Sequence, residues 1–351
     1  MKSNSSKLSD YDYDLPRQLI AQYPRSKRED SRLLILHRKG SRIEHRKFFE
    51  IIEYLHAGDV LILNDTKVVP AKIVGSKKTG GRVEALLIRK IDDAVWELLL
   101  KSNRKLKTND SLYFSDHSVE GKTVCKNKTG SWYVEFKNGN EFMEVLKNTG
   151  KMPLPPYIKR NGENQQLTII DETRYQTVYA KNVGAIAAPT AGLHFSEELL
   201  KKITEKKITI GYITLHVGLG TFQTIKDEDF TRHTMHKEFY KVPQNTIDAI
   251  HNAMSLGKKI VATGTTACRV LETIARDGRV KEHSGWTDLF IYPPYQFKVT
   301  DSLVTNFHLQ KTSLMLLVAA FAGRENILNA YKSAIDHGYR FYSYGDCMLI
   351  I

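Results

Sequence analysis

The segment Val261-Ala262-Thr263-Gly264-Thr265-Thr266 joins a short apolar run to a helical pattern. Residues 259–263 are predicted to form a strand, and a helix is predicted to begin near Ala267 and end near Ala275. Between the two lies a turn of glycine and hydroxyl residues at the start of a helix. The backbone N–H groups of such a turn suit a carboxylate or a phosphate. A capped junction without a ligand is the commoner case in general, but the paired Thr265 and Thr266 favour a binding role.

Strand and helix patterns alternate on both sides of this turn. The short apolar runs predicted as strands are residues 33–36, 60–63, 185–188 and 208–216. The helical patterns are residues 48–55, 196–207 and 245–256, with Ser196 as an N-cap and two glutamates after it. This order predicts an α/β domain in which helices pack on a mostly parallel sheet.

The texture changes between residues 67 and 150. Strand-like pieces recur there at short intervals, and turn residues separate them: residues 71–74, 83–88, 96–100, 111–114 and 131–136. Short strands at this spacing predict a small antiparallel β-barrel. A proline-dense return at residues 152–157 marks the way back to the first pattern. We therefore expect a discontinuous α/β catalytic domain (1–66 plus 151–351) and an inserted barrel domain (67–150).

Composition limits the classes of function. The 351 residues are 41% hydrophobic and 26% charged, and 52 Lys and Arg against 39 Asp and Glu give a net charge of +13. This excess favours a polyanionic partner, nucleic acid ahead of membrane, although many basic proteins bind no polyanion. The barrel segment alone carries 16 Lys and Arg against 10 Asp and Glu. Either an RNA-binding face or a solvated lysine-rich surface fits this count.

Location and metal content follow from what the motifs lack. No run approaches the roughly 18 apolar residues of a membrane span, and the polar first ten residues do not resemble a signal peptide. Three cysteines without ligand spacing fit neither disulfides nor a zinc site. We expect a cytoplasmic, monomeric protein without a metal; His233 and His236 are expected to belong to a polar loop and not to a metal site.

Three further segments share the same kinds of residue, a histidine together with threonine, glycine or asparagine. They are Ala187-Ala188-Pro189-Thr190-Ala191-Gly192-Leu193-His194-Phe195, Thr214-Leu215-His216-Val217-Gly218-Leu219-Gly220-Thr221-Phe222 and Thr305-Asn306-Phe307-His308-Leu309-Gln310-Lys311-Thr312-Ser313. Each places a histidine beside Thr, Gly or Asn next to an apolar run, as strand ends in α/β enzymes do. We expect them to form one composite pocket.

The candidate acid and base groups are the three histidines of these segments, since imidazole titrates near neutrality. A single histidine of this kind is more often structural, but the shared surroundings favour a catalytic role for at least one of His194, His216 and His308. The candidate ligand-binding residues are Gly264, Thr265, Thr266, Arg269, Thr190, Asn306 and Trp286. Arg269 is expected in the first turn of its helix, where it would add charge, and Trp286 between Gly285 and Thr287 could stack a nucleobase. Gly218-Leu219-Gly220 is not a dinucleotide fingerprint, because a third glycine is missing.

Ordered blocks along almost the whole chain carry a resemblance to a known family. They include Leu19-Ile20-Ala21-Gln22-Tyr23-Pro24, Leu63-Asn64-Asp65-Thr66-Lys67, Met152-Pro153-Leu154-Pro155-Pro156-Tyr157-Ile158, Arg174-Tyr175-Gln176-Thr177-Val178-Tyr179-Ala180, Gly285-Trp286-Thr287-Asp288 and Tyr344-Gly345-Asp346. With these blocks the sequence resembles the S-adenosylmethionine:tRNA ribosyltransferase-isomerases of queuosine biosynthesis. The resemblance implies the same fold, an α/β domain with an inserted barrel.

The resemblance also implies a reaction. Family members transfer and isomerise the ribosyl group of S-adenosylmethionine onto 7-aminomethyl-7-deazaguanine at the tRNA wobble position, which gives epoxyqueuosine and releases adenine and methionine. S-adenosylmethionine would be a co-substrate, no metal would be needed, and the tRNA anticodon arm would bind the basic surface. Two other hypotheses are a non-catalytic basic RNA-binding protein and, with least support, a hydrolase of a small phosphorylated substrate, for which a nucleophile elbow and a P-loop are missing.

Overall fold

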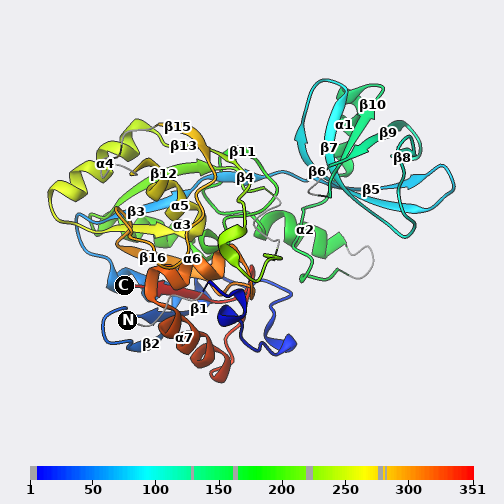
Figure 1. The fold of residues 1–351 in the computed structure, drawn as a ribbon. Helices are drawn as coiled ribbons and strands as arrows, with labels where there is room; N and C mark the ends of the chain where they lie inside the picture. Colours follow the sequence, from blue (N-terminus) through cyan, green and yellow to red (C-terminus); the bar gives the residue numbers. More distant parts are fainter. Residues whose placement is uncertain (1–5, 128–129, 161–164, 219–223, 276–279, 281–282) are drawn as a thin grey trace. The chain divides into compact units, whose positions relative to one another are not determined.

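The chain forms two compact units in a computed structural model that describes residues 6–351 except 128–129, 161–164, 219–223, 276–279 and 281–282 (Figure 1). The first unit comprises Met1–Lys67, Pro155–Arg160 and Gln176–Ile351, and the second comprises Val68–Leu154 and Asn161–Tyr175. Part of the Gly218-Leu219-Gly220 turn lies outside the described residues. Among the described helices, none is long and apolar enough to cross a bilayer.

A nine-stranded sheet organises the first unit. Its order is β15 (Ser284–Thr287), β13 (Glu238–Lys241), β12 (Thr209–Leu215), β3 (Val60–Asn64), β14 (Ile260–Thr263), β16 (Ser302–Asn306), β17 (Cys347–Ile350), β1 (Arg32–Leu36) and β2 (Ile43–Lys47). Four neighbouring pairs are parallel: β12 with β3, β3 with β14, β14 with β16, and β1 with β17. The other four described pairs are antiparallel. The sheet is therefore mixed, and the prediction of a mostly parallel sheet is wrong. The prediction failed because a short buried apolar run looks the same in a parallel and in an antiparallel strand, and because several antiparallel strands were not predicted at all.

Helices cover both faces of this sheet. The helices α4 (Gln244–Ser255), α5 (Gly264–Ile274), α6 (Ser313–Ala322) and α7 (Arg324–Asp336) share one core cluster with Leu34 and Ile62. The 3-10 helix η4 (Phe48–Tyr54) and α3 (Glu197–Glu205) share the other cluster with Leu33 and Leu61. Because successive strand residues point to opposite faces, both faces of β1 and β3 are apolar, as a buried central strand requires.

Most predicted elements of this unit are present. The runs at 33–36, 60–63, 208–216 and 259–263 became β1, β3, β12 and β14. Ser196 caps α3 by accepting a hydrogen bond from the Leu199 N–H at 3.0 Å. The predicted helix at 48–55 is a 3-10 helix instead of an α-helix.

The strand predicted at 185–188 is wrong over most of its length. β11 (Asn182–Ala185) ends where the prediction begins, and it pairs with β4 (Thr66–Val68) outside the large sheet. The segment after it leads through Pro189, which has no backbone N–H to give to a ladder, into the 3-10 helix η5 (Thr190–His194). Ala187 and Ala188 are buried, but in an irregular segment and not in a strand, which is why their apolar pattern was misleading.

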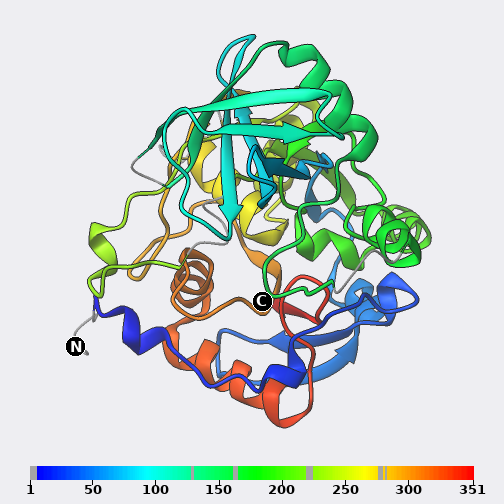
Figure 2. The same cartoon turned by 90° about the vertical axis from the view of Figure 1, so that its right-hand side faces the viewer.

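The second unit contains the predicted antiparallel barrel. It closes in the order β10 (Trp132–Phe136), β7 (Val95–Ser102), β6 (Arg82–Lys90), β5 (Lys72–Lys77), β8 (Ser111–Phe114) and β9 (Val119–Lys126). Figure 2 shows its cyan and teal strands from a second side. Two helices, α1 (Gly139–Thr149) and α2 (Gln165–Arg174), belong to the same unit. The barrel interior is apolar; the rings of Phe136 and Phe142 stack with centroids 4.0 Å apart.

Three elements of this unit were not predicted: the strand β9 and the helices α1 and α2, the last of which occupies part of a stretch interpreted as a polar loop over 161–170. In β9, buried residues alternate with exposed ones, but the buried ones include Gly121 and Thr123, so the apolar period is weak.

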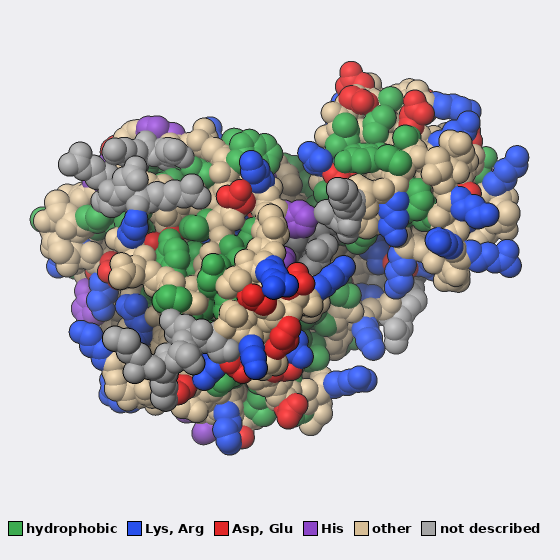
Figure 3. All heavy atoms as spheres, in the orientation of Figure 1, with side chains coloured by type: hydrophobic (Ala, Val, Ile, Leu, Met, Phe, Trp, Pro, Cys, Tyr) green, Lys and Arg blue, Asp and Glu red, His purple; other side chains and the backbone are tan. Residues whose placement is uncertain are grey.

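Lys and Arg side chains stand out over the surface of the barrel unit in Figure 3.

Candidate functional site

Four parallel strands end at one edge of the large sheet. β12, β3, β14 and β16 are neighbours, and all three of their pairings are parallel. The chain after β3 returns as β12 on one side, and the chain after α4 enters β14 on the other side. In open α/β sheets, ligands bind beyond the carboxyl ends of the strands where the connection direction changes. His216, Gly264 and Asn306 all lie at this edge because each terminates or follows one of these strands.

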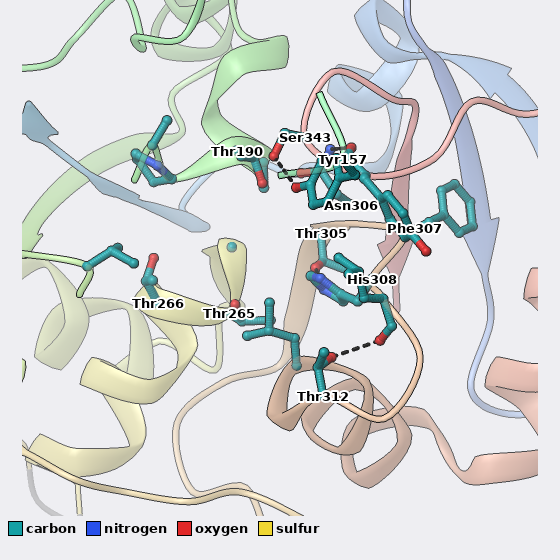
Figure 4. A pocket seen from close by; sticks show the side chains of 18 residues that line it. Tyr157, Thr190, Thr265, Thr266, Thr305, Asn306, Phe307, His308, Thr312 and Ser343 are labelled. Atoms are coloured by element: carbon teal, nitrogen blue, oxygen red, sulfur yellow. Dashed lines mark hydrogen bonds between the residues drawn. The ribbon is translucent and has the colours of Figure 1, made fainter. Parts of the chain in front are cut away.

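A pocket opens at this edge (Figure 4). The following residues line it: Tyr157, Ala188, Pro189, Thr190, Ala191, Val217, Gly264, Thr265, Thr266, Thr305, Asn306, Phe307, His308, Leu309, Thr312, Leu314, Tyr342 and Ser343. In the close-up, Thr265 and Thr266 lie on one side, and Thr305 and His308 on the other. Three sequence segments that were expected to form one pocket thus meet there, joined by the turn between β14 and α5.

The first turn of α5 faces the pocket without a side-chain cap. Its N-cap Thr263 makes no capping hydrogen bond, and the Thr263 hydroxyl has no partner among the described residues. Gly264 has φ +87°, a left-handed conformation that glycine adopts without strain. Thr266 is held from behind, because the side-chain amide of Asn64 donates to its Oγ1 at 3.2 Å. The first N–H groups of a helix have no partner within the helix, and with the helix dipole they suit an anionic group at this end.

His308 lines the opposite wall and is fixed on three sides. Its backbone N–H donates to the Tyr331 hydroxyl at 2.8 Å, the Tyr13 hydroxyl donates to its carbonyl, and its Nε2 lies 2.7 Å from Thr305 Oγ1. Burial lowers the pKa of His308 to about 3. The imidazole is therefore neutral at pH 7.

His216 lies next to the pocket-lining Val217 but does not itself line the pocket. Its Nδ1 is 2.8 Å from Thr66 Oγ1, so the residue after β12 is tied to β4. Burial lowers the pKa of His216, while the charge of Asp65 acts in the opposite direction. Asp65 is itself held, because Thr214 Oγ1 donates to it at 2.6 Å and the Asn182 amide at 2.9 Å.

His194 lies behind the pocket and is bonded through both ring nitrogens. Nδ1 is 2.8 Å from Ser31 Oγ, and Nε2 is 3.2 Å from the side-chain nitrogen of Asn306. The Phe48 ring packs against it at 5.1 Å. Burial first, and the charges of Arg28 and Arg340 second, lower its pKa to about 3. Of the three predicted histidines, only His308 is a lining residue.

Two predicted ligand-binding residues are not at the pocket. α5 begins at Gly264, so Arg269 lies in its second turn and not in the first. The Arg269 guanidinium is buried in an ion pair with Glu238 and also donates to the Leu289 carbonyl. Trp286 lies on the edge strand β15, is 66% exposed and contacts the Phe239 ring at 5.6 Å. Thr190, Gly264, Thr265, Thr266 and Asn306 do line the pocket.

Several lining residues were not predicted. Tyr157 and Ser343 come from distant segments, and their hydroxyls are 2.7 Å apart. Tyr342 has φ +70°, unusual for a residue with a Cβ. The blocks around residues 157 and 344 were noted only for their resemblance to a family, and no local pattern placed them at the site. No group of three or more potential metal ligands is found within the described part of the chain.

Comparison with known proteins gives a consistent result. The family model of queuosine biosynthesis proteins matches residues 8–350. The S-adenosylmethionine:tRNA ribosyltransferase-isomerase of Clostridium kluyveri is 46% identical over 345 residues, 98% of this chain and 99% of that protein. The enzyme of the same name from a Sulfurihydrogenibium species is 47% identical over 357 residues, 98% of this chain and all of that protein. A crystal structure of S-adenosylmethionine tRNA ribosyltransferase from Thermotoga maritima covers 97% of this chain at 37% identity, with a TM-score of 0.56.

Proposed function

The chain belongs to the queuosine biosynthesis protein family, and we propose that it is an S-adenosylmethionine:tRNA ribosyltransferase-isomerase. It would transfer and isomerise the ribosyl group of S-adenosylmethionine onto 7-aminomethyl-7-deazaguanine at the wobble position of tRNA. Epoxyqueuosine-tRNA, adenine and methionine would be the products. The observation that carries this proposal is the pocket at the carboxyl ends of four neighbouring strands, with an uncapped helix N-terminus in its wall.

The methionine end of S-adenosylmethionine carries a carboxylate, which the first turn of α5 would bind. Thr265 and Thr266 supply hydroxyls there, and the backbone N–H groups of the turn supply the positive end of the helix dipole. Arg269 is not needed for this contact, since its charge is neutralised by Glu238. Burial of Thr265 and Thr266, which are 6% and 7% exposed, strengthens hydrogen bonds to a charged ligand.

The reaction requires proton transfer at two points. The sulfonium of S-adenosylmethionine acidifies the ribose carbon bonded to it, so a neutral imidazole beside that carbon can take its proton. Departing adenine must receive a proton to leave as a neutral base. We assign these two tasks to His216 and His308. Either imidazole, neutral at the start, can take the ribose proton, and the imidazolium so formed can then give a proton to the departing adenine. His216 is the better base, because Asp65 favours its protonated form, whereas burial disfavours the protonated form of His308.

The tRNA would bind to the basic surface of the protein, because Lys and Arg side chains contact phosphates whatever the nucleotide sequence. The protein has a net charge of +13, and the segment 67–150 has six more basic than acidic residues. We propose that this segment, as an inserted domain, contributes contacts to the anticodon arm. Trp286, exposed beside Phe239, is available to stack an unpaired base.

Calorimetry with S-adenosylmethionine tests the binding half of this proposal. The wild-type protein should bind, and Thr265→Val and Thr266→Val should each weaken binding roughly tenfold, the size of one lost charge-assisted hydrogen bond. Thr168→Val, on α2 of the second unit, is the matched control. A wild-type protein that binds tRNA but not S-adenosylmethionine would overturn the proposal in favour of a non-catalytic RNA-binding protein.

Two properties remain predictions. We propose that the protein acts as a monomer, which light scattering after gel filtration measures directly. We also propose that it works in the cytoplasm, where its tRNA substrate is found. Fractionation of cells that express a tagged chain tests the second point.

A further inference from the structure

Asn306 presents one polar atom that the protein leaves without a partner. Its side chain is 2% exposed and lines the pocket. The side-chain nitrogen donates to the Tyr342 carbonyl at 3.1 Å and lies 3.2 Å from His194 Nε2. The side-chain oxygen, Oδ1, is buried and has no hydrogen-bond partner within the described residues. A buried acceptor of this kind is costly unless something donates to it.

The orientation of this amide follows from its neighbours. The Tyr342 carbonyl can only accept, so the Asn306 nitrogen and not its oxygen must face it. One N–H of that nitrogen goes to Tyr342, and the other is left for His194. His194 Nε2 must then be the acceptor, which leaves the imidazole proton on Nδ1.

Ser31 completes the same arrangement. Ser31 Oγ lies 2.8 Å from His194 Nδ1 and donates to the Arg28 carbonyl at 3.3 Å. Its hydroxyl proton is used on that carbonyl, so its oxygen is free to accept from the Nδ1–H of His194. The opposite tautomer would require Asn306 to turn over and would set its oxygen against the Tyr342 carbonyl. One assignment of protons satisfies all four hydrogen bonds and leaves Asn306 Oδ1 without a donor among the described residues.

We propose that Asn306 Oδ1 accepts a hydrogen bond from an N–H or O–H group of bound S-adenosylmethionine, and that His194 is a positioning residue that holds the Asn306 amide in this orientation. This assignment rests on the proposed function for the identity of the ligand. Three kinds of donor on that ligand share the required chemistry: the exocyclic amine of adenine, the ribose hydroxyls and the methionine ammonium. His194 acts through Asn306 and does not exchange protons with substrate.

A binding cycle between ligand and protein tests the acceptor. Calorimetry compares S-adenosylmethionine with three analogues, which lack the adenine amine, a ribose hydroxyl or the ammonium group, on the wild type and on Asn306→Ser. One analogue should bind the wild type roughly tenfold more weakly than S-adenosylmethionine and show no such difference on Asn306→Ser. Equal losses on both proteins for all three analogues would overturn the assignment. Absence of S-adenosylmethionine binding by the wild type would instead overturn the proposed function itself.

Two further arms test His194. His194→Gln keeps an acceptor toward Asn306 and should retain affinity within about threefold, whereas His194→Leu should lose about tenfold. His45→Leu is the matched control, because His45 is also hydrogen-bonded in this unit but its partners, Tyr339 and Ser333, do not line the pocket. If the variants do not fold, ¹⁵N NMR of histidine-labelled wild type still decides: the Nδ1–H tautomer at pH 7 is expected, and an Nε2–H tautomer or a cation would overturn the assignment.

Discussion

A methyl group added at Gly184 would lie 2.9 Å from three atoms of the His216 imidazole. Real Cβ atoms do not approach other atoms so closely, and Gly184 also has φ +152°, which a side chain would strain. β11 therefore passes so close to His216 that only glycine leaves room for the ring. The position of this imidazole is set jointly by Gly184 on one side and by the hydroxyl of Thr66 at 2.8 Å.

Gly184→Ala should therefore displace His216 and reduce kcat about a hundredfold, the cost of misplacing a reacting group by about 1 Å. S-adenosylmethionine affinity should change little. Gly257→Ala is the control, because Gly257 also has a positive φ, +61°, but has open space around its Cβ position. Single-turnover rates measure the effect; equal rates for both variants would show that the position of His216 is not important.

Replacement of both proposed proton-transfer groups tests their role directly. The double variant His216→Gln, His308→Gln should lower turnover by ~10²–10⁴-fold, the usual worth of general acid–base catalysis. His251→Gln serves as control, because His251 lies on α4, its ring bonds the Val280 carbonyl, and it does not line the pocket. Turnover of the double variant within about tenfold of the wild type would exclude general acid–base roles for these histidines.

Stability should fall with pH on the acid side because of two buried histidines. Burial lowers the pKa values of His194 and His308 to about 3, whereas both titrate near 6.5 in the unfolded chain. Between pH 6.5 and 3 the unfolded state binds more protons, so the free energy of unfolding declines as pH falls. Each histidine contributes a slope of up to about 1.4 kcal/mol per pH unit.

Denaturant melts at pH 7, 6 and 5 measure this slope. His308→Gln should be less stable at pH 7 yet lose less stability between pH 7 and pH 5 than the wild type does. The stability that depends on neutral His308 is fully present above pH 6.5 and is lost progressively as the pH falls from 6.5 to about 3. Parallel pH profiles for the two proteins would mean that His308 is not a buried neutral group.

Binding of tRNA should depend steeply on salt. Phosphate contacts release counterions, so the logarithm of the association constant falls by about 0.7–0.9 per contact for each tenfold rise in salt. The exposed Arg104, Lys105 and Lys107 of the barrel unit are the residues to change. Replacement of all three by Gln should weaken tRNA binding. The slope of the logarithm of the association constant against the logarithm of the salt concentration should become shallower by the equivalent of up to about three phosphate contacts. Lys332→Gln on α7 is the control, and an unchanged slope would remove this segment of the barrel from the interface.

The sequence was sufficient to predict features whose residues are neighbours along the chain. The turn at Gly264-Thr265-Thr266 could be predicted because an apolar run, a glycine and a helix pattern follow one another, and all three residues line the pocket. The barrel could be predicted from the spacing of its turns. The resemblance of ordered blocks gave the family, which the comparisons confirm.

The sequence was insufficient where partners are distant in the chain. Arg269 looked available for an anion, but its partner Glu238 comes from another strand, and no spacing rule connects the two. The separation of His194 from the pocket surface depends on Ser31, 163 residues away. Strand direction was equally hidden, because β17 pairs parallel with β1 and antiparallel with β16 through the same apolar residues. Such contacts are decided by tertiary packing and not by local pattern.

The proposed activity is tested most directly by a mass-spectrometric assay of the purified protein with S-adenosylmethionine and tRNA that carries 7-aminomethyl-7-deazaguanine. The modified base should shift to the mass of epoxyqueuosine while adenine and methionine appear in equal amounts. An unchanged tRNA mass, with both substrates shown to bind, would contradict the proposed activity.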